Sequence, residues 1–366
     1  MADFIPGIEL SRLFYTEAVK PILAATIPDL QYSAALIGSG SEVLGFDTPM
    51  STDHHWGPRL MLFLREEDYN HRRKDIDDAL RLELPTRFYG YSTNFTLPNP
   101  TDHNVQLLEE VDCGPINHRV EIYTIRGYFL GYIRFNIDEV IEPADWLTFP
   151  EQKLLSVSGG EVYEDDIGLQ SVRDRFSYYP HDVWLYLLAS GWTRIGQEEH
   201  LMGRAGTVGD ELGSALIGSR LVRDAMRLCF LMEKQYAPYA KWFGKAFNKL
   251  ECAADLSPIM SKVLAAETWK EREKHLAMMY EYIAEMHNRL GITEALPVNV
   301  AIFFGRPFRV IEASGGFASA IRRRITDPAV KRIAEGKLIG SIDQFSDSVD
   351  ILSDPQWRKK LRRLYK

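Results

Sequence analysis

The chain has 366 residues, of which 45% are hydrophobic and 26% are charged, and its formal net charge is −8. This composition excludes an intrinsically disordered chain. The negative charge argues against binding to long nucleic acid, because that binding depends on the neutralisation of phosphates by Lys and Arg. A chain of this length more often forms two domains than one.

The cysteines and the hydropathy pattern indicate where the protein resides. Cys113, Cys229 and Cys252 lie in unrelated contexts without a CxxC spacing, which is typical of reduced thiols. The first residues lack a basic region followed by an apolar one, so no secretory signal is expected. No window approaches about 18 uninterrupted apolar residues, so no membrane span is expected. We therefore expect a soluble cytoplasmic protein that does not act at a membrane.

The first third of the chain alternates between helical and strand-like patterns. We predict a helix over residues 9–23, a buried strand over 30–38 and a second strand over 58–64. A polar amphipathic helix over 70–84 follows, then loops over 86–105 that leave room for a short strand over 87–91, and a third strand over 118–125. Residues 127–135 fit either a helix or an irregular lid.

The pattern changes between residues 145 and 180 and is almost entirely helical from Pro180 onward. Long amphipathic helices are predicted over 211–235 and 268–291. The apolar stripe expected on the first of them consists of Leu212, Leu216, Val222, Ala225, Cys229 and Met232. The predicted fold class is α+β, with a mixed sheet and flanking helices over residues 1–150 and a helical domain over residues 151–366.

The stretch from residue 38 to residue 60, GSGSEVLGFDTPMSTDHHWGPRL, contains most of the candidate functional residues. Gly38, Ser39 and Ser41 follow an apolar strand. A Gly-Ser turn at such a place lets backbone N–H groups and a hydroxyl approach a phosphate closely. The same residues also dominate ordinary turns.

Asp53 and His55 are two residues apart before the predicted second strand. In an extended chain their side chains point to the same side, so both can bind one ion. A carboxylate suits Mg²⁺, and an imidazole suits Mn²⁺, Co²⁺ or Zn²⁺ better. The alternative is a polar surface loop between two strands. Glu121, in the middle of the third strand, points either to solvent or into a site.

Together these features resemble the nucleotidyltransferase fold. The stretch 38–60 is similar to the Gly-Ser…Asp-x-Asp motif of the kanamycin and lincosamide nucleotidyltransferase group in the polymerase-β-like superfamily. The chain most closely resembles a bacterial family of unknown function. Residues 140–155, 178–247 and 340–352 carry similar strings, so the resemblance covers nearly the whole chain.

The resemblance implies metal-dependent transfer of a nucleoside monophosphate from an NTP, such as ATP, to a hydroxyl of a small acceptor, with Mg²⁺ or Mn²⁺ as the cofactor. Asp53 matches the first acid and Glu121 is the candidate for the third, so Asp53, His55 and Glu121 are the implied metal ligands. His55 stands where the second acid is expected. The site therefore uses one metal, is compensated by His54 or another acid, or binds nucleotides without transferring them.

The resemblance also implies residues that contact the nucleotide. Gly38, Ser39 and Ser41 match the phosphate-binding turn. Arg59 follows the motif and either reaches the triphosphate or forms a surface ion pair.

In the helical half, which is implied to cover the site, Glu198 and Glu199 are candidate general bases for the acceptor hydroxyl. Arg220 and Arg223 are candidate nucleotide-binding residues, because arginines present bidentate donors to phosphate. The alternative for all four is routine ion pairing at a helix surface. The basic C-terminal segment over 358–366 is expected to be solvated.

Overall fold

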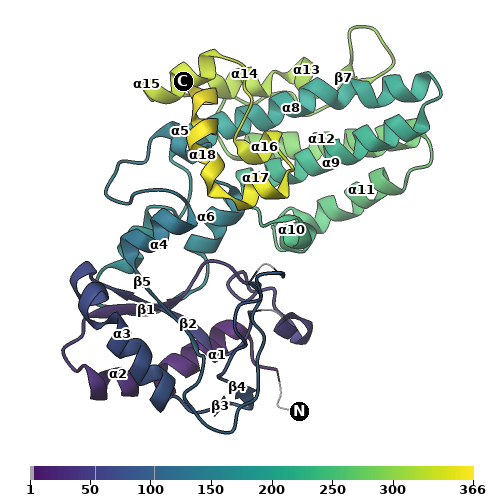
Figure 1. The fold of residues 1–366 in the computed structure, drawn as a ribbon. Coiled ribbons are helices and arrows are strands. Elements are labelled where there is room, and N and C mark those ends of the chain that lie inside the picture. Colours follow the sequence, from purple (N-terminus) through teal and green to yellow (C-terminus); the bar gives the residue numbers. More distant parts are fainter. Residues whose placement is uncertain (1–3, 54, 103) are drawn as a thin grey trace. The chain divides into compact units, whose positions relative to one another are not determined.

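The computed structural model describes residues 4–53, 55–102 and 104–366, apart from the side chain of Asp53. The chain folds into two compact units, coloured along the sequence in Figure 1. Unit 1 consists of Met1–Val140 and Lys153–Ser177, and unit 2 consists of Ile141–Gln152 and Tyr178–Lys366. The chain thus passes between the units three times, whereas our division at residues 150–151 allowed for one passage.

Unit 1 begins with the predicted first helix, which the structure divides into α1 (Gly7–Phe14), a π-helical turn η1 (Tyr15–Val19) and α2 (Lys20–Thr26). The wide turn lies shortly before Pro21, whose ring lacks an N–H and clashes with the carbonyl of the preceding helical turn. Leu10, Phe14 and other apolar residues of this helix are buried in the core of the unit.

The centre of unit 1 is a four-stranded sheet with the order β5-β2-β1-β6. Strands β1 (Tyr32–Leu36), β2 (Arg59–Leu64) and β5 (Arg119–Thr124) confirm the three predicted strands. β2 runs antiparallel to β1 and parallel to β5. All residues of β1 and β2 are buried, whereas β5 alternates between buried and half-buried residues. The sheet is therefore mixed, in agreement with the expected α/β content.

The fourth strand, β6 (Glu161–Asp165), pairs antiparallel with β1 and was not predicted. Its sequence EVYED is mostly polar and none of its residues is fully buried, so it lacks an apolar strand pattern. The register pairs Leu36 with Glu161 and Arg59 with Arg119. The end of β1 therefore lies at the same end of the sheet as the starts of β2, β5 and β6. We call this end of the sheet, where the Gly-Ser turn follows β1, its turn end.

Helices surround the sheet of unit 1. α3 (Glu66–Glu83) confirms the predicted polar helix and buries Ile76 and Leu80. α4 (Ile125–Tyr132) shows that the segment read as a helix or a lid is a helix, capped by the Thr124 hydroxyl. The remaining elements are β3 (Arg87–Phe88), β4 (Tyr91–Ser92), α6 (Glu151–Ser158) and α7 (Leu169–Asp174).

Unit 2 is predominantly helical. Its longest helices are α8 (His181–Thr207), α9 (Glu211–Met232) and α12 (Trp269–Arg289). Shorter elements are α5 (Pro143–Trp146), α10 (Ala240–Phe247), α11 (Ala253–Ala265), β7 (Ala301–Ile302), β8 (Arg309–Val310), α13 (Glu312–Gly315), α14 (Phe317–Arg322), α15 (Pro328–Glu335), α16 (Ile342–Phe345), α17 (Val349–Ser353), η3 (Pro355–Trp357), α18 (Arg358–Leu361) and η4 (Arg362–Tyr365). No helix within the described ranges is long and apolar enough to cross a membrane.

The apolar stripe expected on α9 is wrong at its start. Leu212 and Leu216 are 74% and 59% exposed. Helical spacing places both on the face of Arg223 and Arg227, away from the buried face that contains Ser214, Gly218 and Leu221. α9 therefore buries its second half more completely than its first.

The basic C-terminal segment is not solvated throughout, contrary to expectation. The Arg358 guanidinium is buried, donates to Asp145 Oδ1 at 2.8 Å and lies 3.7 Å from the centre of the Phe149 ring. Asp145 also accepts the backbone N–H of Glu142 at the start of α5. The last helical residues of unit 2 are thus fixed to its first helix.

Candidate functional site

The Gly-Ser turn follows β1 directly and depends on its glycines. Gly38 has a φ of +83° and Gly40 a φ of +146°, a region that disfavours residues with a Cβ atom. A Cβ atom on Gly38 would lie only 2.4 Å from the Tyr128 hydroxyl. The Gly38 N–H donates to the Ser156 carbonyl of α6 at 2.8 Å. Ser39 is exposed at the turn end, whereas the Ser41 carbonyl accepts the N–H of Phe46.

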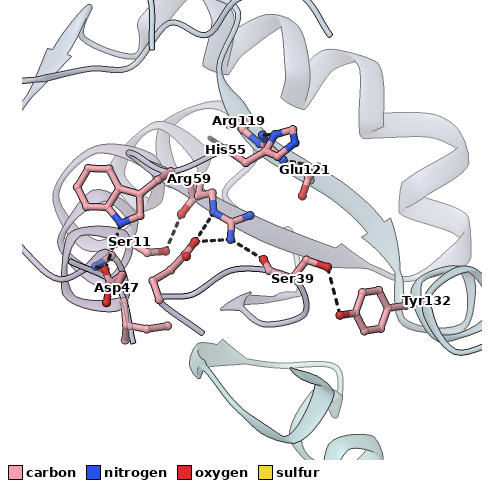
Figure 2. Close-up of polar contacts among 12 residues, drawn as sticks. Ser11, Ser39, Asp47, His55, Arg59, Arg119, Glu121 and Tyr132 are labelled. Carbon is pink, nitrogen blue, oxygen red and sulfur yellow. Dashed lines mark hydrogen bonds and ion pairs between the residues drawn. The ribbon is translucent and has the colours of Figure 1, made fainter. Parts of the chain in front are cut away.

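Arg59, a candidate triphosphate ligand, supports this turn from inside. Its Nη2 donates to the Ser39 carbonyl at 2.7 Å and its Nε to Glu42 Oε1 at 2.9 Å (Figure 2). Burial lowers the pKa of Arg59, but the charges of Glu42 and Glu121 raise it above its ordinary value. The guanidinium is therefore charged, and its donors are already directed to the protein.

The segment that carries Asp53 and His55 is not extended. Asp53 ends the 3-10 helix η2 (Pro49–Asp53), and His55 has a φ of +53°. The expectation that strand geometry directs both side chains to one side is wrong, because the strand begins only at Arg59, after Gly57 with a φ of +144°. The side chain of Asp53 and the whole of His54 lie outside the described residues.

His55 contacts Arg119 at the start of β5. The Arg119 Nη1 lies within hydrogen-bonding reach of His55 Nδ1, and a guanidinium can only donate. Nδ1 is therefore the acceptor nitrogen and Nε2 carries the proton of the neutral ring. Coordination of a metal by His55 in this tautomer requires Arg119 to move away. Burial, followed by the charge of Arg59, lowers the pKa of Arg119.

Glu121 lies on the same face of β5 as Arg119, and Figure 2 shows it beside Arg119 and His55. The distance between Arg119 Nη2 and Glu121 Oε1 is 3.7 Å, and 34% of the Glu121 side chain is exposed. Glu121 also lines a shallow pocket of about 260 Å³ with Arg73 and Asp77 of α3. It is thus half-buried, between the two alternatives that the sequence left open.

The described side chains at the turn end do not form a complete cation site. Among the residues described, no group of three His, Cys, Asp or Glu side chains is placed to hold a metal ion. Both His55 and Glu121 face the positive charge of Arg119, which opposes a cation between them. A divalent cation here needs a third oxygen donor together with a shift of Arg119.

Asp47, between the Gly-Ser turn and η2, has a structural role. Its Oδ2 accepts the Gly7 N–H at 2.7 Å and the Trp56 Nε1–H at 3.2 Å. These two bonds join the start of α1 to the loop before β2.

Of the two candidate bases, Glu199 is a structural residue. Its carboxylate accepts the N–H groups of Ile311 at 2.7 Å, Ala313 at 2.9 Å and Glu312 at 3.3 Å. It is 2% exposed, and burial raises its pKa despite these bonds. Glu199 therefore caps α13, and its oxygens are directed to backbone donors.

Glu198 lies among charged partners on α8 and α9. Its Oε1 pairs with Arg220, whereas its Oε2 is buried without a hydrogen-bond partner in the described part of the chain. Burial raises the pKa of Glu198. Arg223 pairs with Asp347 at 2.5 Å and approaches Asp224 at 3.7 Å. These ion pairs match the routine alternative, although Glu198 retains a carboxylate oxygen that could accept a proton.

The candidates thus fall into two groups. Gly38, Ser39, His55, Arg59 and Glu121 come together at the turn end in unit 1. Glu198, Arg220 and Arg223 come together on α8 and α9 in unit 2.

Two further residues near the turn were missed from the sequence. The Tyr132 hydroxyl of α4 lies 3.2 Å from Ser39 Oγ, and Lys153 Nζ of α6 lies 4.1 Å from the centre of the Tyr132 ring. No sequence pattern links Ser39 to Tyr132, which lies 93 positions later, or to Lys153 beyond it. Only the packing of α4 and α6 brings them together.

Comparison with known proteins gives one match. A family model described as a domain of unknown function (DUF4037) matches residues 146–243. The match includes α6, β6, α8 and α9, but not the Gly-Ser turn, His55 or Glu121. No curated protein and no solved structure matches the chain. The resemblance to a family of unknown function is therefore supported for this part of the chain.

Proposed function

We propose that the protein is a nucleotidyltransferase that moves a nucleoside monophosphate from an NTP to a hydroxyl of a small acceptor. The observation that carries this proposal is the convergence of the Gly-Ser turn after β1, His55 before β2 and Glu121 on β5 at one end of a mixed sheet. A phosphate-compatible turn and an acid that follows Ser39 by 82 residues in the sequence thereby come to the same end of the sheet.

The chemistry assigns a task to each group. The Ser39 turn contacts the phosphates, and Asp53 and Glu121 would supply carboxylates for a divalent cation, which would neutralise charge on the triphosphate. The acceptor oxygen forms a bond to the α-phosphorus while the bond to the bridging oxygen breaks and pyrophosphate leaves. The hydroxyl proton passes to a carboxylate.

The test is calorimetry of ATP with Mg²⁺ or Mn²⁺ on the wild type and Asp53→Ala. The wild type is expected to bind ATP only with metal, and Asp53→Ala at least about tenfold more weakly, as expected for loss of a charged ligand. Asp29→Ala, which removes an exposed carboxylate in unit 1, is the control. Absence of ATP binding by the wild type with both metals would overturn the proposal.

The contact between Arg119 and His55 favours a second candidate, a nucleotide-binding protein without transferase activity. At the position where the motif has its second acid, this chain has His55, whose neutral ring accepts a hydrogen bond from the Arg119 guanidinium. This candidate predicts ATP binding without pyrophosphate release over a panel of hydroxylated acceptors. Pyrophosphate release by the wild type with any acceptor excludes it.

A further inference from the structure

In unit 1, one tyrosine contacts both a lysine ammonium group and the exposed Ser39 hydroxyl. Tyr132 connects the two, because its hydroxyl lies 3.2 Å from Ser39 Oγ and the face of its ring lies 4.1 Å from Lys153 Nζ. A cation over an aromatic face is held in place at little electrostatic cost. The turn therefore has a positioned positive charge in addition to its own N–H groups, whereas Arg59 is directed into the protein.

A buried hydroxyl also faces the turn. Tyr128 stacks on Tyr132 with ring centres 5.4 Å apart, and only 5% of Tyr128 is exposed. Its hydroxyl lies against Gly38 and has no hydrogen-bond partner in the described ranges. Burial raises the pKa of Tyr128 well above its ordinary value, so the hydroxyl keeps its proton. A buried donor without an acceptor is unfavourable, which indicates that a ligand oxygen belongs here.

The strand order sets the direction in which a ligand extends. Across the turn end, Glu121 of β5 comes first, the turn after β1 lies further along, and β6, which directly follows α6, is last. The helix that carries Lys153 leads into β6, so it reaches the sheet on the other side of the turn from Glu121. A nucleotide whose α-phosphate lies near Glu121 extends its outer phosphates over Ser39 toward Lys153.

We propose that Lys153, Tyr128 and the Ser39 turn form a subsite for a diphosphate group. This group is either the outer two phosphates of the NTP or the pyrophosphate product. The inference rests on the proposed function and assigns the part of the substrate that the turn binds. Lys153 supplies charge, Tyr128 donates one hydrogen bond, and Tyr132 positions the lysine.

The test is calorimetry with Mg²⁺ using ATP, AMP and inorganic pyrophosphate as separate ligands. Lys153→Met is expected to weaken the binding of ATP and of pyrophosphate by about tenfold or more, the usual effect of losing a charged contact, and to leave AMP binding unchanged. Lys74→Met is the matched control, because Lys74 is 84% exposed on α3 in the same unit. This control should bind all three ligands as the wild type does.

The outcomes separate the subsite from the proposed function. Equal ATP affinity of the wild type and Lys153→Met overturns the subsite and leaves the function standing. No ATP binding by the wild type with Mg²⁺ or Mn²⁺ overturns both. An equal loss of affinity for AMP and for ATP in Lys153→Met also overturns the subsite, because Lys153 would then not contact the outer phosphates specifically. Binding of pyrophosphate but not ATP overturns the link to the nucleotide and leaves a site for the free anion.

Tyr128→Phe provides a second variant, which decides the question if Lys153→Met does not fold. It removes one oxygen and keeps the stack on Tyr132. We expect ATP and pyrophosphate to bind several-fold more weakly and AMP to bind as before. Unchanged binding of ATP by this variant contradicts the assignment of the hydroxyl.

Discussion

Arg59 and Glu42 form an ion pair in the interior of unit 1, with 6% and 4% of their side chains exposed. The same guanidinium holds the Ser39 carbonyl of the turn. Removal of the carboxylate leaves a buried cation without its partner, an effect of about 3–5 kcal/mol. We therefore predict that Glu42→Ala lowers the free energy of unfolding by about that amount, as measured by urea denaturation. Asp29→Ala, at an exposed ion pair, is the control. A loss below about 1 kcal/mol for Glu42→Ala, the range of surface pairs, would show that the pair is not buried in solution.

His55→Asp is predicted to increase the affinity for Mn²⁺ and Mg²⁺. The substitution removes the ring that accepts from Arg119 and introduces a carboxylate near Glu121, which suits hard cations better. Calorimetric titration of metal should show at least about tenfold tighter binding, the scale of one added charged ligand. His71→Asp, at an exposed position of α3, controls for the added charge. Tighter Mn²⁺ binding by the wild type than by His55→Asp would instead identify His55 as a ligand.

Glu199 and Glu198 are neighbours in sequence with different expected effects. Glu199→Ala leaves three backbone N–H groups of residues 311–313 without their acceptor, so we predict a stability loss of about 3 kcal/mol, since each unsatisfied group costs roughly 1–3 kcal/mol. Glu198→Ala removes one partner of a half-exposed arginine and should have a smaller effect. Thermal unfolding of both variants measures the difference. The reverse order would show that the α13 cap is not the main role of Glu199.

Glu151 is predicted to make unit 2 less stable as the pH rises. Burial, and then the charge of Asp343, raise the pKa of Glu151 from 4.5 to about 8, with Arg227 and Tyr179 also facing the carboxyl group. The folded protein therefore holds a proton that the unfolded chain loses between these two values. Its contribution to stability is complete below pH 4.5 and is lost as the pH rises toward about 8.

Glu151→Gln tests this linkage, because the amide cannot ionise. The difference in unfolding free energy between this variant and the wild type should shift in favour of the variant as the pH rises from 5 to 8. Glu335→Gln, an exposed glutamate on α15, controls for the loss of one charge. Parallel stability curves for Glu151→Gln and the wild type would contradict the raised pKa.

Local patterns predicted most elements but not the roles of charged residues. The apolar runs of β1, β2 and β5 are strong signals because their residues are buried in continuous or alternating order. β6 lacks such a run, since its place depends on pairing with β1, more than 120 residues earlier. The structural role of Glu199 is equally remote, because its backbone partners lie more than 110 positions later. Neither relationship leaves a trace in the neighbouring sequence.

The same limit applies to the candidate site. The Gly-Ser turn was identified because glycine at a strand end has a direct conformational meaning. Arg59 was open to two interpretations because its partner, Glu42, lies within a loop that has no recognisable period. Lys153 and Tyr132 were missed because two helices, one of them predicted as either a helix or an irregular lid, must be packed before the residues become neighbours.

β6 is the last strand of unit 1 in the chain, and residues 141–152 of unit 2 precede it. During synthesis a ribosome therefore completes β1, β2 and β5 well before β6, which pairs with the other edge of β1, emerges. Until then β1, whose residues are all buried in the folded protein, presents an unpaired apolar edge of the kind that joins other chains. A shortened gene ending at residue 150 would hold the nascent chain in that state. A transfer of unit 1 into another protein must therefore include residues 153–177 and cannot end at residue 150.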